Sequence, residues 1–345
     1  MFNILRPLIF KFSPEVAHSL AIKALKLNNI PYSKPKDNHI LETTFCEKKL
    51  SSPIGVAAGF DKNAEVYNPL FNLGFGFVEV GTITPKPQFG NPKPRVFRLE
   101  KEEALINRLG FNNHGSEIIS KRIAENLPSG FLGINVGPNK ETQNKEEDYF
   151  LCLSRLGTQA GYLTINISSP NTKGLRDFQE EKSLSELLSC ISETRENLKR
   201  PIPIFLKIAP DLARNDLETI AEVAVAHKID AIIATNTTLD RKGINNVYRE
   251  VAGGLSGKPL FEKSTRVLAI MSDTLGGRIP LIGVGGISCG SDAYQKICAG
   301  ASAVQLYTAL IYQGFSLIGR IATELDKCLE GGGFENVSEA VGSQA

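Results

Sequence analysis

The chain has 345 residues with a formal net charge of +2, and 42% of the residues are hydrophobic. This length suffices for one large α/β domain or two small ones, and so small a net charge gives no reason to expect a nucleic-acid partner. No run approaches the roughly 18 apolar residues that a transmembrane helix needs. The six cysteines form no Cys-x-x-Cys pair and do not lie near histidine at zinc spacing, so we expect reduced thiols and no metal site.

Residues 1–38 are expected to form an N-terminal helical extension. Leu5, Leu8, Ile9 and Phe12 recur at helical spacing, and Ser13-Pro14 is typical of a helix start. The second helix is expected to run to about residue 27 and to end before two prolines; its apolar face comprises Val16, Leu20, Ala24 and Leu27, and the prolines are Pro31 and Pro35. Two readings are open: a structural plug on the protein surface, or an apolar, membrane-facing collar around a tunnel. Residues 39–52 are expected to form a hairpin.

Eight short apolar runs follow, with helical patterns between them. They cover residues 54–58, 77–81, 131–136, 162–167, 204–208, 231–234, 281–284 and 303–306. The runs are rich in Val and Ile and do not alternate with polar residues, which is typical of parallel strands buried on both faces. We therefore predict a (β/α)₈ TIM barrel over residues 39–335, with its floor covered by the hairpin and with a tail at 336–345. A doubly wound sheet is the alternative.

Polar side chains occupy the carboxyl ends of these runs. They include Lys62, Thr82, Asn135, Asn166, Ser169, Lys207, Thr235, Asn236, Thr237, Tyr307 and Thr308. A barrel gathers these ends into one mouth, where the active sites of this fold lie. The stretch Asn166-Ile167-Ser168-Ser169-Pro170-Asn171-Thr172 has the highest density of amide and hydroxyl side chains. Burying such groups is costly unless they are paired, so this stretch is expected to contact a ligand. Ser169 alone would be read as a turn hydroxyl, and the absence of a Gly-x-Ser-x-Gly elbow argues against acyl transfer.

Three glycine-rich or hydroxyl-bearing turns predict a phosphate-bearing ligand. They lie at 253–257, 283–286 and 307–308, and barrels hold phosphate in the loops after strands seven and eight. Lys207 needs a negative partner, either a reduced flavin ring or a carboxylate of the barrel. Lys62 is better suited to a substrate carboxylate. The long segment 85–113, which ends in amides, is expected to be a functional loop.

Six motifs together resemble dihydroorotate dehydrogenase. They are Ala57-Ala58-Gly59-Phe60-Asp61-Lys62, Gly81-Thr82-Ile83-Thr84-Pro85, Asn107-Arg108-Leu109-Gly110-Phe111-Asn112-Asn113, Asn166-Ile167-Ser168-Ser169-Pro170-Asn171-Thr172, Ala234-Thr235-Asn236-Thr237-Thr238 and Gly283-Val284-Gly285-Gly286-Ile287. The chain resembles the class 2, quinone-reducing type, because Ser169 stands where class 1 enzymes carry cysteine. His18 and Arg98 match polar residues that class 2 places at its quinone tunnel.

The resemblance implies oxidation of dihydroorotate to orotate by one non-covalent FMN with a quinone acceptor, in pyrimidine biosynthesis. It implies Ser169 as the catalytic base and Thr172 as a proton relay. FMN would be held by Ala58, Gly59, Phe60, Asp61, Lys62, Thr82, Asn135, Asn166, Lys207, Thr235, Gly257, Gly286, Tyr307 and Thr308. Substrate would be held by Lys62, Asn107, Arg108, Leu109, Gly110, Phe111, Asn166, Asn171, Asn236 and Thr237. We expect a monomer at the cytoplasmic periphery of a bacterial inner membrane.

Three rival functions are kept. A phosphosugar isomerase or aldolase barrel would share the phosphate turns without a flavin. A class 1 enzyme would use fumarate or NAD, which Ser169 and the extension disfavour. A barrel that only binds ligands is the third.

Overall fold

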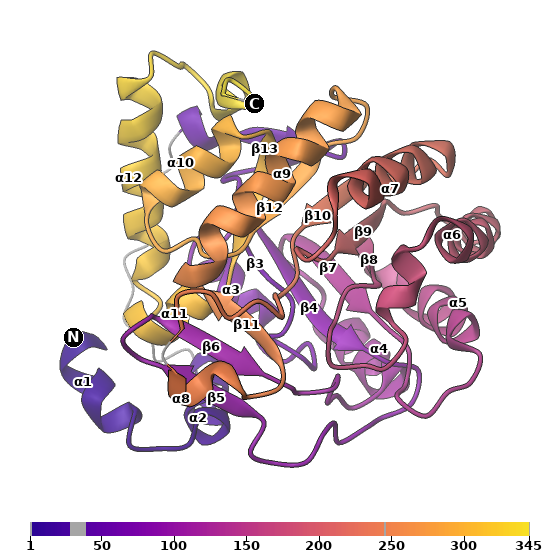
Figure 1. Cartoon of the computed structure of the whole chain (residues 1–345), viewed down its shortest axis with the longest axis horizontal. Helices are drawn as coiled ribbons and strands as arrows, with labels where there is room; N and C mark the ends of the chain where they lie inside the picture. Colours follow the sequence, from indigo (N-terminus) through magenta and orange to yellow (C-terminus); the bar gives the residue numbers. More distant parts are fainter. Residues whose placement is uncertain (1, 28–38, 245, 345) are drawn as a thin grey trace.

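Eight parallel strands close into a barrel in the computed structural model, which describes residues 2–27, 39–244 and 246–344 (Figure 1). They are β3 (Ile54–Val56), β4 (Phe77–Ile83), β7 (Phe131–Val136), β8 (Tyr162–Asn166), β9 (Ile204–Ile208), β10 (Ala231–Ala234), β12 (Leu281–Val284) and β13 (Ala301–Leu306). Each strand pairs in parallel with the next one around the barrel, and β13 closes onto β3. The predicted barrel and all eight of its strands are confirmed.

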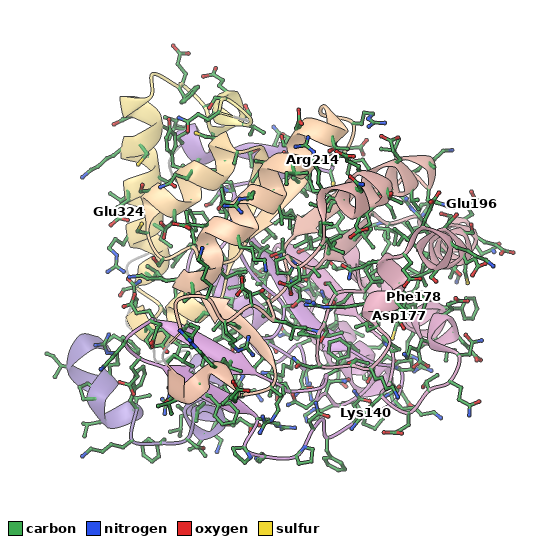
Figure 2. All side chains as sticks on the ribbon, in the orientation of Figure 1. Lys140, Asp177, Phe178, Glu196, Arg214 and Glu324 are labelled. Atoms are coloured by element: carbon green, nitrogen blue, oxygen red, sulfur yellow. The ribbon has the colours of Figure 1, made fainter. Side chains whose placement is uncertain are left out.

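Helices connect successive strands and cover the outside of the barrel (Figure 1). They are α3 (Tyr67–Asn72), α4 (Ser116–Glu125), α5 (Lys145–Leu156), α6 (Glu181–Glu196), α7 (Arg214–Ala226), α9 (Phe261–Leu275), α10 (Gly290–Cys298) and α12 (Leu317–Gly331), with the short α8 (Asn246–Arg249) and α11 (Thr308–Gln313) in loops. Side chains fill the space between helices and barrel, while charged groups such as Glu196 and Arg214 point outward (Figure 2).

The barrel interior is apolar at its floor and polar toward its mouth. Side chains of a strand alternate between its two faces, so interior positions recur every second residue. At the floor the rings of Tyr162 and Phe205 stack with centroids 4.1 Å apart. Gly133 makes room for them, because a Cβ there would lie 2.0 Å from Cζ of Tyr162. Two positions further along the same strands, the interior residues are Thr164 and Lys207.

A two-stranded antiparallel hairpin closes the floor, as predicted. It consists of β1 (Thr43–Phe45) and β2 (Lys48–Leu50). Phe45 and Leu50 are buried against the floor aromatics, and the ring of Phe45 meets that of Phe205 edge to face at 5.6 Å. The hairpin therefore seals the barrel at the end opposite its mouth.

A three-stranded antiparallel sheet lies over the mouth, and the sequence did not predict it. It comprises β5 (Val96–Leu99), β6 (Ala104–Asn107) and β11 (Gly254–Gly257), in the order β11-β6-β5. The segment 85–113 is therefore only partly a loop. The stretch 253–257, read as a glycine-rich turn, is mostly strand β11, because residues 254–257 pair with residues 104–107.

Two helices precede the barrel and lie beside this small sheet (Figure 1). They are α1 (Phe2–Ile9) and α2 (Pro14–Lys26). Ser13 is the N-cap of α2 and Pro14 begins the helix, as predicted, although the Ser13 side chain makes no capping hydrogen bond. Helix α2 ends at Lys26 with Leu27 as its C-cap, which agrees with the predicted end at about residue 27. Pro31 and Pro35 lie outside the described residues.

The apolar stripe predicted for α2 is largely exposed, because the helix packs through Ile22 and Leu25 instead. With α1 it presents a set of apolar side chains that are about half exposed: Leu5, Leu8, Phe12, Val16 and Leu20. No helix in the described ranges is long and apolar enough to cross a membrane. At the other end of the chain, Val337 and Ala340 are buried, so the predicted tail packs onto the protein.

Candidate active site

A cavity of about 1480 Å³ opens at the carboxyl ends of the barrel strands. Its wall includes nearly all of the predicted site residues: Ala58, Gly59, Phe60, Asp61, Lys62, Thr82, Asn107, Leu109, Gly110, Phe111, Asn166, Ser169, Asn171, Lys207, Thr235, Asn236, Thr237, Gly257, Gly286, Tyr307 and Thr308. The same cavity continues to residues of α1 and α2, including Leu5, Ile9 and His18. One space thus joins the barrel mouth to the N-terminal helices.

Three of the residues with predicted roles do not line this cavity. Asn135 lies one layer deeper, where it accepts a hydrogen bond from Thr82 at 2.6 Å and donates to Glu79 at 2.8 Å. The guanidinium group of Arg108 lies over the ring of Phe97 and donates to the backbone oxygen of Pro94 at 2.9 Å. Thr172 is buried beside the cavity wall.

Four asparagine side chains form two hydrogen-bonded pairs in the cavity wall. Asn236 Nδ2 donates to Asn166 Oδ1 at 3.2 Å, and Asn171 Nδ2 donates to Asn107 Oδ1 at 3.3 Å. The backbone oxygen of Asn166 accepts from the buried hydroxyl of Tyr149 at 2.7 Å, which fixes the end of β8. Asn166 is buried and the other three are half-buried, and amides held in this way offer donors and acceptors at defined positions to a ligand.

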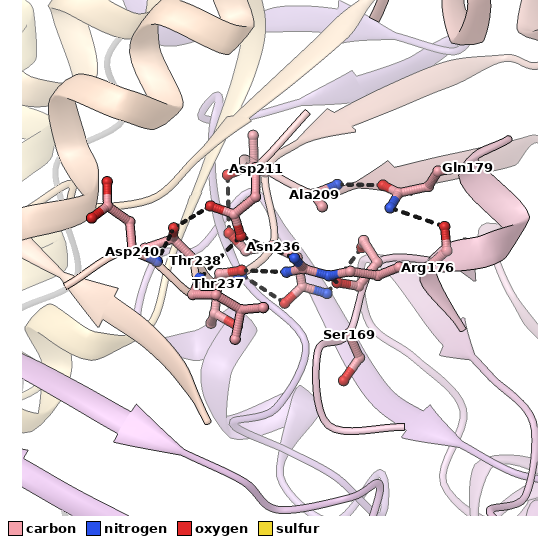
Figure 3. Close-up of polar contacts among 12 residues, drawn as sticks. Ser169, Arg176, Gln179, Ala209, Asp211, Asn236, Thr237, Thr238 and Asp240 are labelled. Carbon is pink, nitrogen blue, oxygen red and sulfur yellow. Dashed lines mark hydrogen bonds and ion pairs between the residues drawn. The ribbon is translucent and has the colours of Figure 1, made fainter. Parts of the chain in front are cut away.

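Ser169 lies three residues after the end of β8, and its side chain is buried at the cavity wall. Its Oγ accepts a hydrogen bond from the backbone N–H of Asn171 at 3.3 Å. The hydroxyl points away from the guanidinium group of Arg176 (Figure 3). Its own proton is therefore not engaged by the polar network behind it.

That network, which the sequence did not predict, is centred on Arg176 and Asp211 (Figure 3). Arg176 donates to the backbone oxygens of Ser168 and Thr237, each at 3.1 Å, and to Asp211 at 3.0 Å. Asp211 also accepts from Lys263 at 2.7 Å. These bonds join the loops after β8, β9 and β10, and they hold the pKa of Asp211 below its usual range despite burial.

Two opposite charges are buried within the barrel, Lys207 on β9 and Glu79 on β4. The Glu79 carboxylate accepts hydrogen bonds from Asn135, Tyr162, Thr164 and Gln305 at 2.8–3.1 Å. Burial lowers the pKa of Lys207, and the charge of Glu79 opposes this. No ion pair within 4.0 Å involves Lys207 among the described residues, so the barrel-carboxylate alternative accounts for its charge only at longer range. Glu79 could have been found from the sequence, because its carboxylate lies in the strand Phe77–Ile83, where the other residues before Thr82 are apolar.

Lys62 lies in the turn after β3 and lines the cavity. Burial lowers its pKa to about 8, although Asp61 and Glu15 favour the charged form. The neighbouring Asp61 has a structural task, because its carboxylate accepts from the backbone N–H groups of Glu65 and Val66 at 2.8 and 2.7 Å. Lys62 therefore carries a cation that a ligand anion could stabilise.

Two glycines at the cavity wall require backbone that other residues rarely adopt. Gly257 and Gly286 have φ angles of 97° and 80°. A Cβ at Gly286 would also lie 2.5 Å from Cβ of Phe261, at the start of α9. The loop after β12 therefore lies directly against α9, and its backbone faces the cavity without side chains.

An aromatic cluster connects α2 to the barrel mouth. The ring of Phe60 meets those of His18 and Tyr307 edge to face, both at 5.5 Å. Burial, together with the charge of Lys62, lowers the pKa of His18 to about 3, so this imidazole is neutral at physiological pH. Arg98 of β5 donates to the backbone oxygen of Phe10 at 3.0 Å and lies over its ring.

The fold and this site define a (β/α)₈-barrel enzyme with a large cavity at the carboxyl ends of its strands. Residues 40–329 match the family model described as dihydroorotate dehydrogenase, and the chain belongs to that family.

Relatives extend this match over almost the whole chain. A protein of Cereibacter sphaeroides called dihydroorotate dehydrogenase (quinone) is 49% identical and covers 97% of this chain and 95% of its own length. A Rhizobium etli protein of the same name is 48% identical, with 93% and 90% covered. Among solved structures, Eimeria tenella dihydroorotate dehydrogenase in complex with ferulenol superposes with a TM-score of 0.92 at 39% identity, covering 96% of this chain and 95% of that one.

Proposed function

We propose that this chain oxidises dihydroorotate to orotate with a quinone as the electron acceptor, in the de novo synthesis of pyrimidines. The observation that carries the proposal is a continuous cavity that contains Ser169 and the asparagine pairs at the barrel mouth and extends to α1 and α2. Family membership and relatives named as quinone-type enzymes support the same activity.

The substrate is proposed to bind between Lys62 and the two asparagine pairs. A pyrimidine ring presents carbonyl and N–H groups along its edge, which Asn107, Asn166, Asn171 and Asn236 can satisfy. Lys62 would pair with the carboxylate of dihydroorotate, because a buried cation and anion stabilise each other where water is excluded. Phe111, Thr237 and the backbone of residues 108–110 complete the proposed substrate set.

The residues at the inner end of the cavity fit FMN. Lys207 is buried there without an ion pair in the described ranges, and Gly257 and Gly286 bring bare backbone to the wall. Lys207 would stabilise negative charge on the reduced ring, and the turns near Gly257, Gly286 and Thr308 would hold the phosphate. The chemistry that FMN supplies when bound is acceptance of a hydride and transfer of two electrons.

Ser169 is proposed to remove the proton from C5 of dihydroorotate at its Oγ. That proton is acidic because a carbonyl group adjoins C5, and the C6 hydrogen leaves as the hydride. A serine hydroxyl is a weak base at neutral pH, so its orientation and a route for the proton must assist it. Arg176 fixes the backbone on one side of Ser169, and the buried Thr172 is the proposed relay on the other.

The chain is proposed to divide into an extension at residues 1–38, the barrel at 39–335 and a tail at 336–345. The quinone is proposed to enter through the extension. The exposed apolar side chains of α1 and α2 would rest on the membrane surface at the cytoplasmic side of a bacterial inner membrane, as a reversible peripheral contact of a monomer. Neutral His18 and the Phe60 cluster would line the path to the flavin.

The visible spectrum of the purified protein tests the proposal. It should show a flavin that heat releases, and anaerobic dihydroorotate should bleach it until a quinone analogue is added. A colourless folded protein that stays inert with added FMN would favour the phosphosugar barrel. Bleaching that fumarate or NAD reverses, and a quinone does not, would favour the class 1 reading.

A further inference from the structure

A buried lysine that the proposed chemistry does not use lies behind the loop after β12. Lys296 of α10 is completely buried, and it does not belong to the cavity wall. Its stem packs beneath β12, because a Cβ at Gly283 would come within 3.1 Å of its Cδ. In Figure 1, α10 and α9 lie side by side next to β12 and β13, and Lys296 bridges the two helices.

The ammonium group of Lys296 is bonded to the first turn of α9. It donates to the hydroxyls of Ser264 and Thr265, each at 2.9 Å. The one proton of the Ser264 hydroxyl is shared between two backbone oxygens, that of Phe261 at 3.0 Å and that of Gly285 at 3.1 Å. A single hydroxyl therefore separates the cation from the Gly285–Gly286 turn that faces the cavity.

No carboxylate neutralises this charge at close range in the described part of the chain. Asp292, one turn earlier on α10, favours the charged lysine from a distance, but its Oδ2 already accepts from the backbone N–H and hydroxyl of Ser288 at 2.7 and 2.8 Å. Burial lowers the pKa of Lys296 to about 7. The ring of Phe261, 5.0 Å from Nζ, gives partial compensation.

A buried cation without a carboxylate at close range is costly, and an apolar side chain of the same length would fill the space more cheaply. An anion bound on the cavity side of the Gly285–Gly286 turn would supply the missing charge. Through a buried, low-dielectric layer a cation acts over longer distances than it does in water.

We propose that Lys296 is a positioning residue whose charge, acting through Ser264 and the Gly285–Gly286 turn, selects a phosphorylated flavin over the same ring without phosphate. The inference rests on the proposed function, since it takes the phosphate of FMN to lie at this turn. The competing view is that Lys296 only fastens α9 to α10 through two hydrogen bonds.

The test compares FMN with riboflavin on apoprotein, by quenching of flavin fluorescence. Lys296→Met should weaken FMN binding by roughly tenfold or more, because it removes a poorly screened charge, while riboflavin affinity changes by less than about twofold. Lys121→Met is the matched control. It removes a lysine from the exposed face of α4, where Glu117 pairs with it at 3.0 Å, and both affinities should stay at wild-type values.

A second variant keeps the test valid if Lys296→Met fails to fold. The melting temperature of each apoprotein shows whether it is folded. Lys296→Gln keeps a donor for the α9 hydroxyls without the charge, and it should show the same selective loss of FMN. If either folded variant keeps the wild-type ratio of FMN to riboflavin affinity, Lys296 is a structural fastener. If the wild-type apoprotein binds neither flavin, the proposed cofactor itself is wrong and this inference falls with it.

Discussion

The guanidinium group of Arg176 lies 3.1 Å from the backbone oxygen of Ser168, the residue directly before the proposed base. The same group reaches Thr237 on the loop after β10, also at 3.1 Å. One side chain therefore sets the spacing between the proposed base and the proposed substrate edge. Asp211 orients it, and Lys263 holds Asp211 in turn.

Replacing Arg176 should slow flavin reduction without unfolding the protein. Arg176→Met leaves Asp211 paired with Lys263 but frees two carbonyl groups, and charged hydrogen bonds contribute about 1.5–3 kcal/mol each. We expect the single-turnover rate with dihydroorotate to fall roughly 10- to 100-fold, because small displacements of a reacting group are costly. Stopped-flow absorbance measures this rate. Arg278→Met, which removes an exposed arginine paired with Glu222, is the control, and equal rates in both variants would contradict the assignment.

Replacing the proposed base, Ser169, should lower the rate of flavin reduction more than replacing Arg176. Ser169→Ala should reduce single-turnover flavin reduction by about 10²–10⁴-fold, the usual contribution of a positioned base, and leave orotate affinity nearly intact. Ser169→Cys should retain part of the rate with a displaced pH optimum, since a thiol loses its proton more readily than a hydroxyl. An alanine variant that reduces its flavin at the wild-type rate would place the base elsewhere.

The barrel could be predicted from the sequence because buried parallel strands are continuous apolar runs. The small sheet could not, because β11 reads Gly-Leu-Ser-Gly and pairs with β6 about 150 residues earlier in the chain. Arg176 was missed for a similar reason. Its partners Ser168, Asp211 and Thr237 are 8, 35 and 61 residues away, and an arginine among polar residues gives no local sign of such contacts.

The site residues at strand ends could be predicted from the sequence, because polar groups that end apolar strands converge in a barrel. The hydrogen-bond partners of these residues could not be predicted. Asp61 belongs to the motif that resembles the family, yet its carboxylate is used by the backbone of residues 65 and 66. Asp61 and Lys62 are neighbours in one motif, yet Asp61 binds the backbone while Lys62 faces the cavity, and only the folded structure distinguishes the two roles.

Orotate binding should depend on pH through Lys62. Burial lowers its pKa to about 8, so the lysine is charged below that pH and becomes neutral above it. Only the charged form pairs with the orotate carboxylate, so affinity should be constant below pH 8 and should weaken as pH rises further. Lys62→Met should bind orotate roughly 30-fold or more weakly, since it strands a desolvated anion, and should lose this pH dependence. Titration by flavin absorbance measures both, and a wild-type pH profile in the variant would exclude Lys62 as the titrating group.

The N-terminal helices are better tested by substitution than by deletion. Glu15 of α2 pairs with the buried Arg95 at 2.8 Å, and Ile22 and Leu25 belong to the main core, so removing residues 1–38 would strand a buried charge and expose apolar surface. The double variant Leu8→Gln, Phe12→Gln changes only side chains that are about half exposed. Each loses roughly 1–3 kcal/mol of transfer free energy into an apolar phase, so binding to lipid vesicles should weaken strongly.

The same double variant should also transfer electrons more slowly to a quinone that is held in the membrane. The double variant should reduce a long-chain quinone in vesicles far more slowly than the wild type, while a water-soluble dye that reaches the flavin directly should be reduced at the wild-type rate. Bound FMN, measured after heat release, shows that the barrel is intact. A matched pair of polar substitutions on the far side of the barrel, Ile118→Gln and Phe150→Gln on α4 and α5, controls for loss of exposed apolar surface in general. If the Leu8→Gln, Phe12→Gln double variant keeps its flavin and still reduces the long-chain quinone at the wild-type rate, the two helices are a structural plug, and the acceptor must reach the flavin by another route.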